Sequence, residues 1–121
     1  MTEIVVLAAI VYFTVFGIGM LLRPALVERF ALQWTDPAGK TEVRCYYGAV
    51  SLALAAFLGY LLTEDLAVQA LTGVLFLATG VLTVRIIGLF VDGGRDHPYP
   101  RSAIPIEAAF VIGLALARVL A

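Results

Sequence analysis

Four long apolar runs alternate with short polar segments along the chain. The runs cover about residues 3–22, 37–62, 64–91 and 102–120, and few charges interrupt them. An α-helix rises about 1.5 Å per residue, so about twenty residues cross a hydrocarbon core of about 30 Å. The pattern predicts an all-α integral membrane protein, a single domain (residues 1–121) in which four transmembrane helices form one bundle.

The first connection combines a helix stop, a short amphipathic segment and a helix start. Proline disfavours helical geometry in the residue before it, so Arg23-Pro24 should end the first helix. Apolar and polar residues alternate irregularly over 24–34, which predicts a short amphipathic helix in the headgroup layer, anchored by Trp34. Asp36 before Pro37 predicts the N-cap of the second helix. An ordinary loop over 24–34 is the alternative.

The other boundaries rest on the same kind of signal. Thr63-Glu64-Asp65 predicts a tight turn and an N-cap that places acids in the first turn of the third helix. Asp92-Gly93-Gly94 should end that helix, because glycine adopts the left-handed conformation readily. Ser102 is the expected N-cap of the fourth helix, which places Pro105 in the first turn, where proline is tolerated.

Small residues mark two helix faces that should contact protein rather than lipid. Ser51, Ala55 and Gly59 follow one another at intervals of four in the second helix. Such spacing lets helix backbones approach closely within a membrane. In the third helix, glycines recur at intervals of seven and eight and predict a groove along one face: Gly73, Gly80 and Gly88.

The composition supports a membrane protein and excludes several other classes. Apolar residues make up 62% of the chain, charged residues 14%, and the mean hydropathy is +1.00. Soluble domains usually have about 45–50% apolar and about 25% charged residues. The net charge of −1 offers no basic face for nucleic acid. The single cysteine, Cys45, cannot form an internal disulfide, and no metal box or cofactor motif surrounds it.

The distribution of basic residues predicts the orientation. With four spans, seven of the eight Lys and Arg residues lie on the side opposite the termini, and only Arg118 lies at the other face. Basic residues concentrate on the cytoplasmic side of membrane proteins. We therefore expect a multi-pass protein of the bacterial inner membrane with both termini outside the cytoplasm.

Two charges inside the apolar helices form the main candidate site. Arg85 lies about six residues, or about 9 Å, before the end of the third helix, and Glu107 lies about 8 Å after the start of the fourth. These helices form an antiparallel hairpin, so both side chains reach a similar depth. An unpaired charge at such a depth costs about 3 kcal/mol or more near mid-bilayer, so we expect an ion pair.

The start of the second helix should bring further polar residues to the same depth. The predicted cluster joins three helices on the cytoplasmic side, with Asp92 at the end of the hairpin and Glu42 at its edge. Its members are Glu42, Arg44, Tyr47, Ser51, Arg85, Asp92 and Glu107. A structural clamp between helices is the first interpretation. A small cavity for a polar headgroup or anion is the second, and a proton path is the third.

The residues that form this cluster also carry a resemblance to a known family. The chain resembles the bacterial membrane family called domain of unknown function 4345. The shared features are a glycine-containing first span followed by Arg-Pro, then EVRCYYGAVSLAL, RIIGLFVDGG, and Ile-Glu at the opening of the last helix. The matching positions are Glu42, Arg44, Tyr47, Gly48, Arg85, Asp92, Gly93 and Glu107. Cys45 stands where the family has a small or polar residue. The resemblance implies a four-helix inner-membrane protein and supplies no activity.

Two functions remain open from the sequence. The first is a binding or accessory module whose polar cluster holds a lipid headgroup, a small anion or a partner membrane protein. The second is a purely structural subunit of a larger membrane complex. A small transporter or membrane enzyme is less favoured, because no nucleotide loop, activated nucleophile or inverted repeat is present. His97 is expected to be an exposed loop residue.

Overall fold

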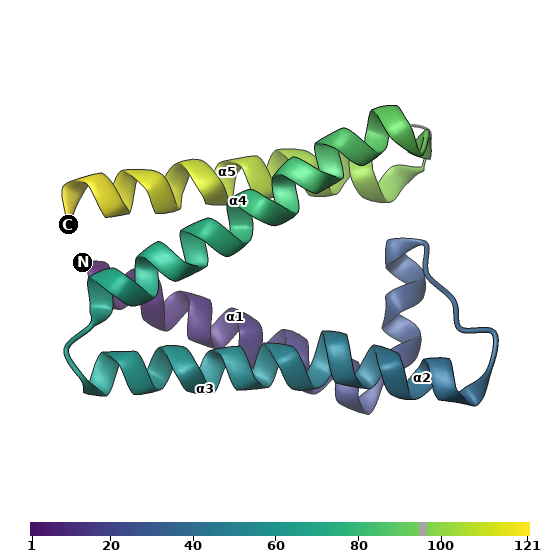
Figure 1. Ribbon diagram of the computed structural model, residues 1–121, viewed down its shortest axis with the longest axis horizontal. Coiled ribbons are helices and arrows are strands. Elements are labelled where there is room, and N and C mark those ends of the chain that lie inside the picture. Colours follow the sequence, from purple (N-terminus) through teal and green to yellow (C-terminus); the bar gives the residue numbers. More distant parts are fainter. Residues whose placement is uncertain (95–96) are drawn as a thin grey trace. The chain divides into compact units, whose positions relative to one another are not determined.

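The computed structural model describes residues 1–94 and 97–121, and its regular structure there is helical. The helices run in the order α1 (Thr2–Leu22), η1 (Pro24–Phe30), α2 (Pro37–Val43), η2 (Arg44–Ala49), α3 (Val50–Thr63), α4 (Ala67–Val91) and α5 (Pro98–Leu120) (Figure 1). The all-α prediction is confirmed. Arg95 and Asp96, which belong to the predicted third loop, lie outside the described residues.

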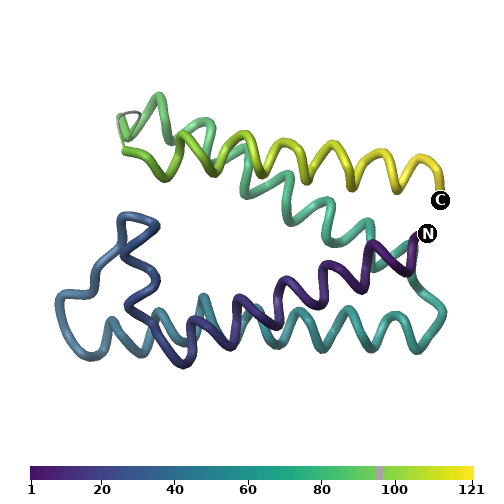
Figure 2. The backbone as a smooth tube through the Cα atoms, turned by 180° about the vertical axis from the view of Figure 1, so that it is seen from behind, coloured from purple at the N-terminus to yellow at the C-terminus, as the bar shows by residue number. Residues whose placement is uncertain are grey.

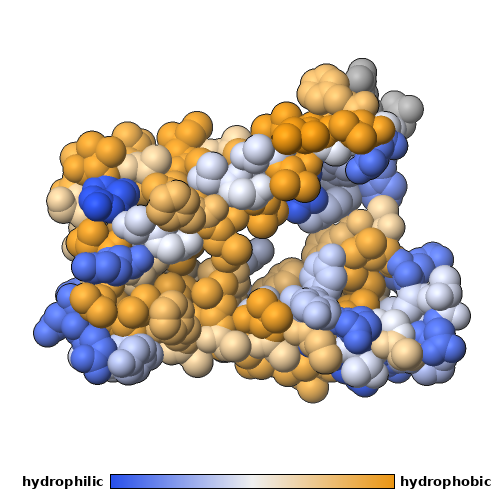
Figure 3. Space-filling model, viewed as in Figure 1, coloured by the Kyte–Doolittle hydropathy of each residue, from blue (hydrophilic) through white to orange (hydrophobic). Residues whose placement is uncertain are grey.

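Four helical stretches in the described part of the chain are long and apolar enough to cross a membrane. They are Thr2–Leu22, Pro37–Thr63, Ala67–Val91 and Pro98–Leu120. Little of each stretch is buried inside the protein, so their apolar side chains face outward. Apolar residues cover the helices in the space-filling view, and hydrophilic residues gather near helix ends (Figure 3). These features are compatible with a multi-pass membrane protein.

The chain divides into two compact units, each described here by itself. One comprises Val6–Leu66, and the other comprises Ala67–Ala121 with Met1–Val5. The predicted single domain therefore remains a prediction, because it depends on how the two units associate.

The second span is one continuous helical stretch that changes character part-way. Asp36 caps its start as predicted, since its carboxylate accepts a hydrogen bond of 2.9 Å from the backbone N–H of Ala38. The π-helix η2 interrupts the α-helix, and the N–H of Val50 donates to the carbonyl of Cys45, five residues earlier. π-Helical turns are rare and concentrate at functional or strained positions.

The unit Val6–Leu66 is held by a close crossing of α1 with η2 and α3. A Cβ atom placed on Gly17 would lie 2.9 Å from the carbonyl oxygen of Gly48 and 2.8 Å from Cγ of Leu52. One placed on Gly48 would lie 2.8 Å from the side chain of Leu21. The two glycines therefore permit a backbone approach that any side chain would prevent.

The connection between α3 and α4 differs from the prediction. The N–H of Asp65 donates to the carbonyl of Leu62 and the N–H of Leu66 to that of Leu61, with Asp65 in the left-handed conformation (φ 57°). This is the Schellman arrangement that ends a helix. The acids at 64–65 thus cap the end of α3 instead of the start of α4, which begins at Ala67.

The helices α4 and α5 form an antiparallel hairpin, and they lie side by side in both backbone views (Figures 1 and 2). α4 ends at Val91, followed by Gly93 in the left-handed conformation (φ 80°), so the predicted glycine stop is confirmed. α5 begins at Pro98, four residues before the predicted start.

The early start of α5 overturns two details of the prediction. His97 is the N-cap, because its Nδ1 accepts a hydrogen bond of 3.0 Å from the N–H of Tyr99. Ser102 lies inside the helix, where its hydroxyl donates to the backbone carbonyls of Pro98 and Tyr99. Pro105 consequently occupies the helix interior. Its ring removes one backbone hydrogen bond there, a defect that membrane helices tolerate.

Candidate functional site: an ion pair between two apolar helices and a basic pocket

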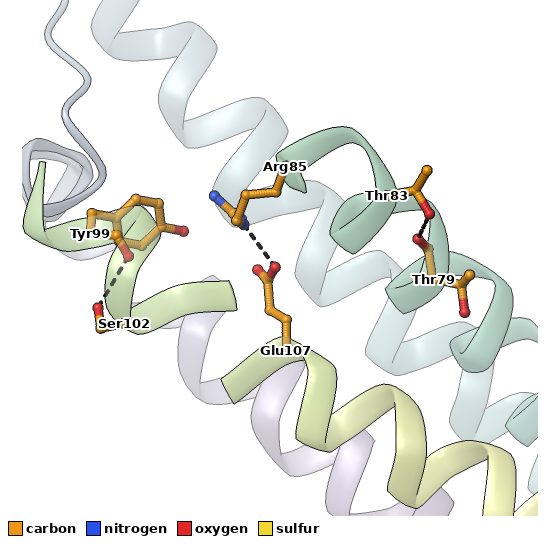
Figure 4. Close-up of polar contacts among 6 residues, drawn as sticks. All are labelled: Thr79, Thr83, Arg85, Tyr99, Ser102 and Glu107. Carbon is orange, nitrogen blue, oxygen red and sulfur yellow. Dashed lines mark hydrogen bonds and ion pairs between the residues drawn. The ribbon is translucent and has the colours of Figure 1, made fainter. Parts of the chain in front are cut away.

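Arg85 of α4 and Glu107 of α5 form the predicted ion pair. Nε of Arg85 donates to Oε2 of Glu107 over 2.7 Å, and the two side chains are 24% and 25% exposed. They point toward each other across the hairpin (Figure 4). Among residues 1–94 and 97–121 this is the only ion pair with a separation of 4.0 Å or less. The predicted contact between the two side chains is confirmed, and their depth in a membrane remains a prediction.

An aromatic ring covers the guanidinium group of Arg85. Its central carbon lies 4.9 Å from the ring centre of Tyr99, which stands in the first turn of α5 (Figure 4). A cation over an aromatic face at this distance gains electrostatic stabilisation, which grows where water is excluded. Tyr99 was not predicted to belong to the site. The prediction placed Tyr99 in a loop, whereas α5 begins at Pro98 and therefore includes it.

A second contact holds the opposite end of the hairpin. Nε of Arg118 in α5 donates to the hydroxyl oxygen of Thr72 in α4 over 2.8 Å, and that hydroxyl donates to the carbonyl of Val68. Arg118 is exposed, as its expected position at the outer interface requires. The hairpin therefore has one arginine contact near each end, one arginine coming from each helix.

Asp92 stays outside the ion pair within the described residues. It is exposed, and its backbone N–H donates to the carbonyl of Gly88. Its carboxylate oxygen lies 3.5 Å from where a Cβ of Gly88 would stand, so the side chain folds back over the last turn of α4. Asp92 thus belongs to the helix end and not to the Arg85 contact.

The predicted members on the second span serve the packing of the unit Val6–Leu66. Nε of Arg44 donates to the carbonyl of Leu21 over 3.2 Å, which satisfies one of the unpaired carbonyls at the end of α1. The hydroxyl of Ser51 donates to the carbonyl of Tyr47, one turn earlier. Glu42 is exposed.

Three aromatic rings link the elements of this unit. Tyr47 of η2 lies 6.2 Å from the ring of Phe30 in η1, and both lie near Phe16 of α1, at 6.5 and 6.1 Å. Such pairs add about 0.5–1.5 kcal/mol each beyond their buried area. Tyr47 therefore joins α1, η1 and η2. A meeting of Arg44, Tyr47 and Ser51 with Arg85 and Glu107 remains a prediction.

A pocket that the sequence did not predict lies between η1, the segment that follows it and α2. Its volume is about 430 Å³, and three basic side chains surround it. The lining residues are Arg23, Pro24, Ala25, Leu26, Glu28, Arg29, Trp34 and Lys40. We call this the basic pocket. The sequence does not reveal that these basic residues converge, because their convergence depends on how the chain folds back between residues 31 and 36.

Trp34 and Lys40 are held together at the edge of the basic pocket. Nζ of Lys40 lies 6.0 Å from the Trp34 ring centre, at the outer limit of a cation–π contact. A Cβ on Gly39 would lie 2.7 Å from Cβ of Trp34, so only glycine allows the tryptophan to sit this close to α2. The predicted short helix over 24–34 is present only in part, as the 3-10 helix η1, which ends at Phe30 and leaves Trp34 outside it.

The predicted glycine face of α4 includes a shallow apolar groove. A Cβ added to Gly73 or Gly80 would meet no atom within 4 Å, and both residues are exposed. The groove is lined by Phe76, Leu77, Gly80, Val81, Val84 and Arg85. We call it the α4 groove. These positions repeat at intervals of four along one side of the helix, and the last of them is the arginine of the ion pair.

Other reactive side chains form no metal site in the part of the chain that the structure describes. No group of three or more His, Cys, Asp or Glu residues comes together there. Cys45 is exposed and unpaired, and His97 is exposed and serves as a helix cap. The predicted exposure of His97 is confirmed, but its role as the N-cap of α5 was not predicted.

Comparison of the chain with protein-family models, curated proteins and solved structures gave no match. The site must therefore be interpreted from its own geometry.

Proposed function

We propose that this chain is a small accessory protein of the bacterial inner membrane that binds an anionic amphiphile on its α4–α5 hairpin. In this proposal both termini lie outside the cytoplasm and the ion pair lies in the cytoplasmic third of the membrane. The amphiphile is a lipid or lipid-like molecule with a phosphate or carboxylate head. The resemblance to the four-helix family agrees with this setting.

The observation that carries the proposal is the position of Arg85 at the end of the α4 groove. From Phe76 to Arg85 the helix rises about 13 Å, and the intervening groove residues are apolar. Gly80 provides depth in the middle, because it has no side chain and open space beside it. A shallow apolar groove that ends at a cation matches a molecule with an apolar tail and an anionic head.

Arg85 has the chemistry to hold such a head. A guanidinium group binds phosphate or carboxylate oxygens through up to two parallel N–H bonds, and it is hydrated more weakly than an ammonium group. About a quarter of each partner in the ion pair remains exposed, and the contact with Glu107 uses Nε. In the proposal, Glu107 is the ion-pair partner of Arg85 in the absence of ligand, and the incoming anion displaces the Glu107 carboxylate from the guanidinium group.

The test compares lipid retention by wild type, Glu107→Gln and the double variant Arg85→Gln/Glu107→Gln. Each protein is purified in mild detergent, exposed to phosphatidylglycerol and examined by native mass spectrometry. Glu107→Gln should increase retention, on the order of tenfold, because a competing charged hydrogen bond of about 1.5–3 kcal/mol is removed. The double variant should retain less lipid than the wild type, because Arg85 no longer holds the head. Equal retention by all three proteins would show that the Arg85–Glu107 pair only holds α4 and α5 together and does not bind lipid.

Two matched glycine variants separate the tail from the head. Gly80→Leu fills the α4 groove, whereas Gly73→Leu adds the same side chain to an exposed position outside its lining. Lipid retention should fall for Gly80→Leu and stay unchanged for Gly73→Leu. If Gly73→Leu instead removes a co-purifying membrane protein and lipid retention never changes, the role of a structural subunit is the better explanation.

A further inference from the structure

The basic pocket is separate in chain position from the Arg85 site. It belongs entirely to the unit Val6–Leu66. Three of its side chains are cationic and one, Glu28, is anionic, so the local formal charge is +2 (three minus one). The remaining lining consists of apolar residues and Trp34.

The cations of the basic pocket have no carboxylate partner within residues 1–94 and 97–121. Among the described residues, the only ion pair joins Arg85 and Glu107, so Arg23, Arg29 and Lys40 lie more than 4.0 Å from any described carboxylate oxygen. Glu28 is among these carboxylates, although it lines the same pocket. A concave site with three cations that the protein does not neutralise favours an external anion.

The position of the basic pocket indicates the source of that anion. It begins directly after α1, the first membrane-length helix, and extends to Lys40 in the first turns of the second span. In the predicted membrane arrangement, both of these ends lie at the headgroup layer. Tryptophan concentrates in the same layer of a membrane, with its ring between apolar and wet surroundings. Trp34 is half-buried beside Lys40.

We propose that the basic pocket binds the phosphate group of an anionic lipid headgroup through Arg23, Arg29 and Lys40. The apolar part of the lining, Pro24 to Leu26, lies against the glycerol and first chain carbons. This site goes beyond the amphiphile binding proposed for Arg85, because it shares no residue with the α4–α5 hairpin. Each site can therefore fail without the other.

The chain contains a built-in reporter for this proposal. Trp34 is the sole tryptophan of this 121-residue chain, so the intrinsic tryptophan fluorescence of the chain reports on the basic pocket. The protein is placed in phosphatidylcholine nanodiscs with increasing fractions of phosphatidylglycerol. We expect a saturable change in Trp34 emission that weakens as salt concentration rises, because interfacial charges are screened.

Arg29→Gln tests the basic pocket, and Arg101→Gln is the matched control. Both arginines are exposed and predicted to lie on the same side of the membrane, but only Arg29 lines the pocket. A hydrogen bond to a charged group contributes about 1.5–3 kcal/mol, so Arg29→Gln should raise the half-saturating lipid fraction about tenfold or more. Arg29→Lys should restore most of the response. Arg101→Gln should leave it unchanged.

Two outcomes would overturn the proposal. Equal weakening by Arg29→Gln and Arg101→Gln would show diffuse surface charge in place of a site. A response to inorganic phosphate in pure phosphatidylcholine nanodiscs, without a response to phosphatidylglycerol, would show a site for soluble phosphate. Circular dichroism of each variant checks that its helix content is unchanged, and Lys40→Gln provides a second pocket variant if Arg29→Gln does not fold.

Discussion

Single glycines decide how closely the first two spans approach. Gly17 and Gly48 face each other so tightly that an added Cβ would lie within 3 Å of backbone or side-chain atoms of the other element. Gly59, in the same unit, has open space beside it. The same residue type therefore has opposite roles at positions that look similar in the sequence.

Gly17→Ala should destabilise the protein, because its Cβ would meet the backbone carbonyl oxygen of Gly48, which cannot move as a side chain can. We expect a loss of about 1–3 kcal/mol, the usual cost of overpacking. Gly59→Ala should be neutral or stabilise by up to about 1 kcal/mol, since alanine favours helix more than glycine. Thermal unfolding in detergent, followed by circular dichroism, measures both, and equal midpoints would contradict the close crossing.

The hairpin of α4 and α5 is the element in which charge and stability are most closely linked. Its two arginine contacts have very different surroundings. The Arg85–Glu107 pair is three-quarters buried, whereas Arg118 and its contact with Thr72 are exposed. The first contact should therefore matter for stability far more than the second.

Removing one partner of the Arg85–Glu107 pair should cost more than removing both. Arg85→Leu or Glu107→Leu alone strands a charge among apolar residues, at about 3–5 kcal/mol for a buried pair and less for one that remains partly exposed. The double variant Arg85→Leu/Glu107→Leu strands none. Unfolding free energies from a double-mutant cycle give the coupling directly. Additive losses would mean that the two side chains do not interact.

Arg118→Leu provides the comparison at the other end of the hairpin. Exposed contacts of this kind contribute about 0–1 kcal/mol, so its unfolding midpoint should remain close to that of the wild type. A loss as large as that of Arg85→Leu would show that the Thr72 contact is buried when the protein lies in its membrane.

Sequence reasoning succeeded at the element scale where the signal was local and strong. The apolar runs gave the four spans, Asp36 gave a cap, and the matched depths of Arg85 and Glu107 gave their contact. It failed where two local signals competed. Residues 64–65 could start one helix or end another, and a left-handed Asp65 decided for the end.

The position of each residue along its helix was enough to predict the contact between Arg85 and Glu107, but not the partners of the other polar residues. Arg44 and Tyr47 share a face with Ser51, but their partners, the Leu21 carbonyl and the Phe30 ring, come from other elements. The basic pocket was missed for the same reason. Its side chains all lie within residues 23–40, but Trp34 and Lys40 join the others only because the chain folds back after η1.

At the scale of the whole molecule, the charge distribution predicts the direction of insertion. In a Cys45→Ser background, single cysteines at Thr35 and Glu64 mark the two ends of the second span, and both positions are exposed. A membrane-impermeant maleimide added to intact spheroplasts should label the cysteine at position 64 and not the one at position 35. Opened membranes should label both, and the reverse pattern in intact cells would refute the orientation.

The π-helix η2 has a consequence for how the length of this chain can vary. In a π-helical turn the backbone hydrogen bond spans five residues, whereas it spans four in an α-helix. The second span therefore contains one residue more than a continuous α-helix would need. Deleting Ala49 could close η2 into an ordinary α-helix while the faces before and after it keep their directions. A related chain one residue shorter at 44–49 would then retain the same buried face, and the deletion would be accommodated without a break in the span.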